Sequence, residues 1–109
     1  MAVEYKVLGQ SAPSAATNTN VYTVPSLTSA IISTITIANR GATDGSYRIA
    51  VRPAGATLEN KHYISYDIDL PSYTSDNVTI GITLATTDII TVYASTSDFS
   101  FNLFGSELT

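Results

Sequence analysis

The chain has 109 residues, a formal net charge of −4 and no cysteine, and only 13% of its residues are charged. This length suits a single domain, residues 1–109, with a core of its own. The missing cysteines exclude a disulfide framework and a thiolate metal site, and the negative charge argues against a surface that binds nucleic-acid phosphates. Because the chain opens without a basic segment before an apolar run, and no 18 apolar residues occur together, we expect a soluble protein with no signal peptide and no membrane contact.

The amino-terminal region predicts one strand followed by an irregular stretch. Residues 3–8 alternate Val3, Tyr5 and Val7 with polar neighbours, which is typical of a short edge strand. Residues 9–20 are small and polar without periodicity, so we expect a polar loop or arm there. A brief strand at residues 21–24 ends at Pro25, whose ring cannot donate to a strand ladder.

Residues 31–53 predict a β-hairpin with one buried face. The connection at residues 39–45 is rich in Gly, Asn and Asp, which favour turns. On both sides of this connection every second residue falls on the same predicted face. Before it these residues are Ile31, Ser33, Ile35 and Ile37, and after it they are Tyr47, Ile49 and Val51.

The remaining chain predicts further strands and no confident helix. Residues 54–61 read as a loop with a helical turn, and residues 71–77 as a second loop. Residues 62–70 predict a strand with Ile64, Tyr66, Ile68 and Leu70 on its apolar face, and residues 78–84 a strand in which Gly81 marks a bulge or a close approach. Residues 88–94 predict a strand with Ile90, Val92 and Ala94 on one face. Residues 99–104 predict the last strand, with Phe99, Phe101 and Leu103 on one face and Phe104 on the other.

About eight short strands with turn signals between them predict an all-β fold. Nearly every strand has one apolar face, so we expect an antiparallel β-sandwich, either jelly-roll-like or immunoglobulin-like. The periodicity leaves the order of the strands open.

The sequence gives no sign of catalysis, and we expect a non-enzymatic protein without a cofactor. Its one histidine, His62, has no second histidine or cysteine as a partner, and no Gly-x-Ser-x-Gly motif is present. We expect His62 to face solvent at a strand entrance. Asp67 and Asp69 share a strand face and could meet Asp76, Asp88 or Asp98, which leaves a calcium site as an alternative although no EF-hand spacing occurs.

The best-supported functional hypothesis is association through a surface. Apolar residues remain on the faces opposite the core stripes, and exposed patches of this kind mark association sites. We therefore predict a homo-oligomer, with a trimer as one form. Tyrosines that stack on sugar rings are the alternative. The candidate interaction surface comprises Arg40, Arg48, Arg52, Tyr63, Tyr93 and Phe104.

Four segments carry a resemblance to a known family: VLGQSAPSA (7–15), NRGATDGSYRIAVRPAG (39–55), NKHYISYD (60–67) and FNLFGSE (101–107). Together they resemble small virion structural proteins of tailed bacteriophages, including phages of cyanobacteria. The resemblance implies a virion component assembled in the host cytoplasm, with other virion proteins of the capsid, neck or tail as partners. A capsid decoration or cement subunit is the first expectation; a neck, tail or fibre-adaptor component and a glycan- or receptor-binding module are the alternatives.

Overall fold

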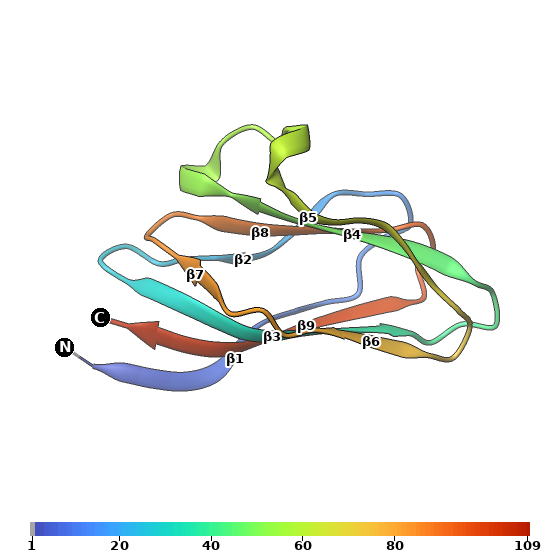
Figure 1. Ribbon diagram of the computed structural model, residues 1–109, viewed down its shortest axis with the longest axis horizontal. Helices are drawn as coiled ribbons and strands as arrows, with labels where there is room; N and C mark the ends of the chain where they lie inside the picture. The colour runs from blue at the N-terminus through green and yellow to red at the C-terminus, as the bar shows by residue number, and fades with distance from the viewer. Residues whose placement is uncertain (1) are drawn as a thin grey trace.

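The computed structural model describes residues 2–109 and shows two antiparallel sheets packed face to face (Figure 1). One sheet has the order β1-β9-β3-β6, with β7 also paired to β3, and the other has the order β2-β8-β4-β5. No helix in residues 2–109 is long and apolar enough to cross a membrane. The elements are β1 (Val3–Ser11), β2 (Thr19–Thr23), β3 (Ser29–Asn39), β4 (Gly45–Arg52), β5 (Tyr63–Leu70), β6 (Ser75–Val78), β7 (Ile82–Leu84), β8 (Ile89–Ala94) and β9 (Phe99–Leu108), with short 3-10 turns η1 (Pro53–Gly55) and η2 (Asn60–His62).

The strand order is that of a jelly roll. The antiparallel pairs are nested, with β4 beside β5, β3 beside β6 and β7, β2 beside β8, and β1 beside β9. The strands β6 and β7 both pair with β3 and together take one strand position, so the nine strands occupy eight places. Nested pairs that alternate between two sheets define the jelly roll rather than the immunoglobulin arrangement.

The predicted hairpin at residues 31–53 is wrong, because β3 and β4 belong to different sheets. Residues 40–44 carry the chain across the sandwich. The buried Asn39 side chain holds this crossing: its Nδ2 donates to the carbonyls of Thr43 (2.9 Å) and Leu70 (3.1 Å), and its Oδ1 accepts the Gly41 N–H (3.0 Å). An alternating pattern shows only that each strand has one buried face. Two strands in opposite sheets that face each other across the core give the same pattern as two strands paired in a hairpin.

A β-bulge in β3 changes which residues point inward. The register between β3 and β9 shifts between Ile32 and Thr34, so Ser33 is the extra residue. Ile32 is therefore buried while Ile31 is 41% exposed, which corrects the predicted single face. Gly105 on β9 makes this close pairing possible, because a Cβ there would lie 2.0 Å from the Ile31 carbonyl oxygen.

The core lies between the sheets and confirms most of the predicted inward faces. The three aromatic and aliphatic residues of β9 and the three inward residues of β8 are almost fully buried, at 1% exposure or less. These six are Phe99, Phe101, Leu103, Ile90, Val92 and Ala94.

Edge strands depart most from the predicted faces and bounds. In β5 the expected apolar face is largely exposed (39–53%) except for Leu70, because the β4–β5 register shifts twice and Asp67 has φ +50°. The predicted strand at 78–84 is interrupted at residues 79–81, where Gly81 has φ +68° and Ile80 is 64% exposed. The first strand continues to Ser11, so the irregular segment covers residues 12–18 rather than 9–20. In place of one helical turn within residues 54–61, two short 3-10 turns, η1 and η2, lie at the two ends of this segment.

Two tyrosines cross the sandwich and donate to carboxylates on the opposite sheet. From β4, the Tyr47 hydroxyl donates to Asp76 Oδ2 on β6 (2.7 Å). From β2, the Tyr22 hydroxyl donates to Glu107 Oε2 on β9 (2.5 Å), and Lys6 Nζ lies 2.6 Å from the other oxygen of Glu107. Burial, reinforced by these carboxylates, raises the pKa of both tyrosines, so their hydroxyls stay protonated donors at neutral pH.

Replacing Tyr47 by Phe should lower the free energy of unfolding by about 1–3 kcal/mol, since it removes a charge-assisted hydrogen bond and leaves Asp76 Oδ2 without its donor. The same substitution at Tyr73, which is 72% exposed, is the matched control and should change stability by less than about 0.5 kcal/mol. Urea denaturation followed by circular dichroism measures both. Equal effects at the two positions would show that the bridge contributes nothing.

Stability should fall on acidification because of Glu107. The hydrogen bond from Lys6, and then that from Tyr22, lowers the pKa of Glu107 below its ordinary value of 4.5. The Glu107 carboxylate thus binds a proton less readily in the folded state than in the unfolded state. Its contribution to the free energy of unfolding is fully present above pH 4.5 and is lost as the pH falls through the lowered pKa of the folded state. In denaturation series from pH 7 downward, Lys6→Met should flatten this acid loss, whereas Lys61→Met should retain the wild-type slope.

Candidate functional site

The outer face of the four-stranded sheet carries an arginine between two tyrosines. The Arg48 guanidinium carbon lies 4.3 Å from the ring centroid of Tyr66 and 4.3 Å from that of Tyr93. Its Nε also donates to Asp67 Oδ1 at 2.6 Å. β4 supplies the arginine, central β8 supplies Tyr93, and the bulged edge strand β5 supplies the other two. Two cation–π contacts together with the ion pair to Asp67 fix this planar group in place.

Arg52 lies on the same outward face of β4 and ties the chain after the strand to the sheet. Its guanidinium donates to the carbonyls of Gly55 and Ala56 and to the side chains of Asn20 and Thr91. Figure 1 shows the two short turns on the outer side of this sheet. These bonds explain why the segment after β4 packs back on the sheet.

Next to this cluster, Tyr63 packs edge-on against Tyr66, with centroids 4.8 Å apart and ring planes at 82°. These two rings and Asn60 line an open hollow of about 470 Å³. Four of the six predicted surface residues are thereby on one sheet face: Arg48, Arg52, Tyr63 and Tyr93.

The other two predicted residues lie elsewhere. Arg40 follows β3 at one end of the sandwich, where it donates to Ser100 Oγ (2.7 Å) and to the Ser97 carbonyl (3.2 Å). Phe104 is on β9 in the five-stranded sheet and is 37% exposed. The arginines therefore do not gather at the tip of a hairpin, because Arg52 lies at the end of β4 opposite the 40–44 crossing.

The outer face of the five-stranded sheet carries an apolar groove that sequence reasoning largely missed. It has a volume of about 530 Å³, and its apolar lining is Tyr5, Val7, Ile31 and Phe104. Tyr5 is 86% exposed, Val7 48% and Ile31 41%. The alternation in residues 3–8 carried a signal for the first two, but the bulge at Ser33 hid Ile31. We call these four residues the apolar groove.

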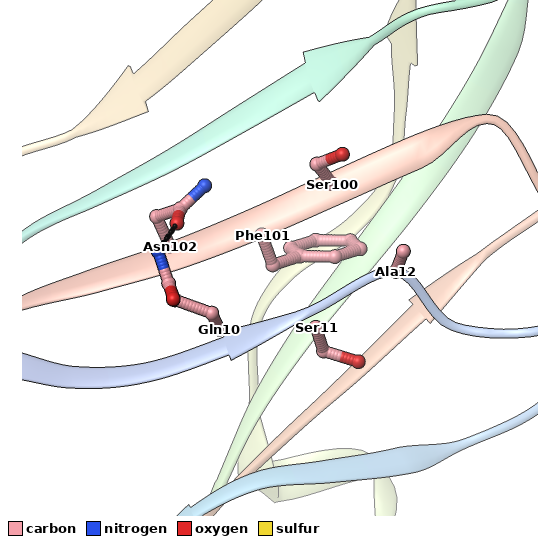
Figure 2. Close-up of a pocket in the computed structure, with 6 residues that line it drawn as sticks. All are labelled: Gln10, Ser11, Ala12, Ser100, Phe101 and Asn102. Carbon is pink, nitrogen blue, oxygen red and sulfur yellow. Dashed lines mark hydrogen bonds between the residues drawn. The ribbon is translucent and has the colours of Figure 1, made fainter.

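A smaller hollow of about 350 Å³ lies over β1 and β9 near their other ends. Figure 2 shows Gln10 and Asn102 facing each other across the two strands, with Gln10 Nε2 donating to Asn102 Oδ1 at 2.7 Å. The Phe101 ring is fully buried. The polar side chains that line this hollow are amides and hydroxyls, which can form hydrogen bonds but do not titrate.

His62 is buried (6% exposed), which corrects its predicted solvent-facing position. Its Nδ1 accepts the backbone N–H of Glu59 at 3.0 Å, and the Glu59 side chain accepts in return from the backbone of His62. This reciprocal arrangement is a capping box, so the histidine organises the turn before β5.

Three of the five carboxylates weighed as calcium ligands are engaged by separate partners. Asp67 pairs with Arg48, Asp76 accepts from Tyr47, and Asp88 accepts the backbone N–H groups of Ala54 and Ala85. Within residues 2–109, no three His, Cys, Asp or Glu side chains group in a way that could hold a metal ion.

No family model, curated protein or solved structure matches the chain. Its function has to be inferred from its own two faces. One is an arginine-tyrosine surface whose polar groups are paired, and the other is the apolar groove, whose side chains are open to solvent.

Arg48→Met should destabilise the fold by about 1 kcal/mol, because it removes two stacking contacts and an ion pair while keeping an apolar stem. Arg40→Met, which removes only hydrogen bonds at the end of the sandwich, should cost less. Thermal unfolding at equal ionic strength compares them. Equal or reversed losses would show that the stacking adds no stability.

Proposed function

We propose that this protein is a non-enzymatic virion structural protein of a tailed bacteriophage, attached in many copies as a capsid decoration or cement subunit. The observation that carries the proposal is the apolar groove, which leaves Tyr5, Ile31 and Phe104 exposed on an open sheet face. An apolar surface of this kind in a small folded domain marks an association site. The resemblance of the sequence to phage virion proteins supplies the setting.

The composition of the surface supports a multivalent attachment role. Only 13% of the residues are charged, so a neutral lattice meets little electrostatic opposition. A groove lined by four apolar residues gives each copy a small contact, and repetition over a lattice multiplies it. Jelly rolls are also a common architecture of viral capsid proteins.

The same contact would serve a neck, tail or fibre-adaptor component, which is the first alternative. Both readings place the mature protein in the virion after assembly in the host cytoplasm, without nucleic acid or membrane as a partner. A net charge of −4 supports the exclusion of nucleic acid. So does the pairing of Arg48 and Arg52 within the chain, which leaves these cations less available to phosphates.

A glycan- or receptor-binding module is the second candidate, favoured by the hollow beside Tyr63 and Tyr66. Exposed tyrosine rings stack on sugars, and Asn60 offers an amide to hydroxyl groups. One feature weakens it: Arg48 already occupies a face of Tyr66, and Tyr63 meets that ring edge-on. Less aromatic surface is thus free than the number of rings suggests.

Incorporation into particles tests the proposal. The double change Ile31→Ser, Phe104→Ser should abolish stoichiometric binding to capsids stripped of the protein, because it removes the apolar lining of the groove. The control Leu27→Ser, Ile80→Ser removes two residues of at least equal exposure outside the groove and should bind like wild type. Circular dichroism checks that both variants fold, and cosedimentation measures binding.

The position of the protein in an imaged particle decides among the readings. Density on the capsid supports the cement role, and retention on purified tails with no capsid binding moves the assignment to the neck or tail. Binding to glycan arrays that is lost in Tyr63→Ala, together with no binding to either particle fraction, would replace the virion proposal by the glycan module.

A further inference from the structure

The strand β1 is the one regular sheet edge in the part of the chain that the structure describes. It pairs with β9 without interruption from Val3 to Val7, and all of these residues are exposed. The other edges carry features that discourage strand addition. β5 has two register shifts and a positive φ at Asp67, β2 is only five residues long and irregular, and β6 and β7 are separated by residues 79–81.

The backbone groups of Val3, Tyr5 and Val7 point outward from this edge. Ala2 and Thr109 exchange both of their backbone hydrogen bonds, at 3.0 and 2.9 Å, so they form a hydrogen-bonded pair of the β1–β9 ladder. Along an antiparallel strand, successive residues point their backbone N–H and C=O groups alternately toward the strand on one side and toward the opposite side. The even-numbered residues of this run therefore bond β9, and the odd-numbered ones present free N–H and C=O groups.

We infer that a second copy of this chain adds to β1 in antiparallel register, with a two-fold axis at Tyr5. In this register Val3 faces Val7 of the second copy, and Tyr5 faces its own equivalent. All six outward N–H groups of the two strands then find carbonyl partners. The contact is isologous, so the same patch serves both copies and the assembly closes as a dimer.

The charges on β1 select this register. With the axis at Tyr5, Glu4 of each copy faces Lys6 of the other, which gives two opposite-charge cross-strand pairs. Moving the axis to Glu4 would place two glutamates opposite each other, and moving it to Lys6 would place two lysines opposite each other. The Lys6 side chain is 42% exposed and the Glu4 side chain 70%. The Lys6 ammonium has three donors, so it can keep Glu107 and still meet a second carboxylate.

The apolar side chains agree with the same pairing. Tyr5 and Val7 line the apolar groove from β1, so joining two β1 edges brings the grooves of both copies into one surface. The inference does not rest on the virion role, because it concerns the free chain in solution. It assigns the expected homo-oligomer a two-fold form instead of a trimer.

Single cysteines give a direct test, since the chain contains none. Opposed Cα atoms in a hydrogen-bonded antiparallel pair are about 5.5 Å apart, within the range of a disulfide. Tyr5→Cys should therefore crosslink to a dimer under mild oxidation. In Val7→Cys the two cysteines are four residues out of register, about 14 Å apart, and should crosslink at least tenfold more slowly. Tyr73→Cys, at a 72% exposed position away from β1, sets the background rate.

Sedimentation equilibrium of the wild-type chain should show a species of twice 11.5 kDa. Glu4→Lys should raise the dissociation constant about tenfold or more, because it sets lysines opposite each other. The same charge change at Asp69→Lys should leave it unchanged. A monomer at 100 µM, a trimer, or crosslinking of Val7→Cys as fast as Tyr5→Cys would each overturn the inference. None of these outcomes depends on particle binding.

Discussion

The structure depends on hydrogen bonds that cross from one sheet to the other. A sandwich with few charged residues and no disulfide needs something besides apolar contact to fix how its layers sit. Tyr47 and Tyr22 provide this, since each fills space between the sheets with its ring and ends on a carboxylate of the opposite layer. A hydrogen bond is directional where burial of apolar area is not, so these bridges restrict sliding of the sheets. Both outer faces are thereby held in a defined relation.

The two outer faces follow opposite strategies. On the four-stranded sheet, Arg48 contacts two tyrosine rings and a carboxylate, and Arg52 donates to two backbone carbonyls and two side chains, so both guanidinium groups have partners within the chain. On the five-stranded sheet, the apolar groove and the outward backbone of residues 3–7 in β1 have no partner among residues 2–109. A face whose polar groups are hydrogen-bonded within the chain contributes to stability, while a face with exposed apolar side chains and free backbone groups is suited to association.

The alternation of apolar residues was enough to predict the fold class and the inward faces of β8 and β9. These strands are paired on both sides, and the extra residues at their register shifts lie on the neighbouring strands, so their own period of two is unbroken. It failed where an extra residue or an edge breaks the period, as at Ser33 and Asp67. Alternation also says nothing about which distant strands pair, and for that reason it predicts β3 and β4 as a hairpin although they lie in different sheets. Four of the six predicted surface residues share a face, but Ile31 in the groove was assigned to the core.

The extra residue at Ser33 gives β3 a local way to change the outer surface of the sheet while the buried residues after the bulge stay in place. Before the bulge, Ile32 points inward and Ile31 outward; after it, Ile35 and Ile37 fill the core. A deletion or insertion here shifts the phase of only the short segment between the bulge and the strand end. Related chains could thus display or withdraw an isoleucine on the outer face by a change of one residue, with the buried residues of the longer segment untouched. Binding specificity and fold can then vary separately within one strand.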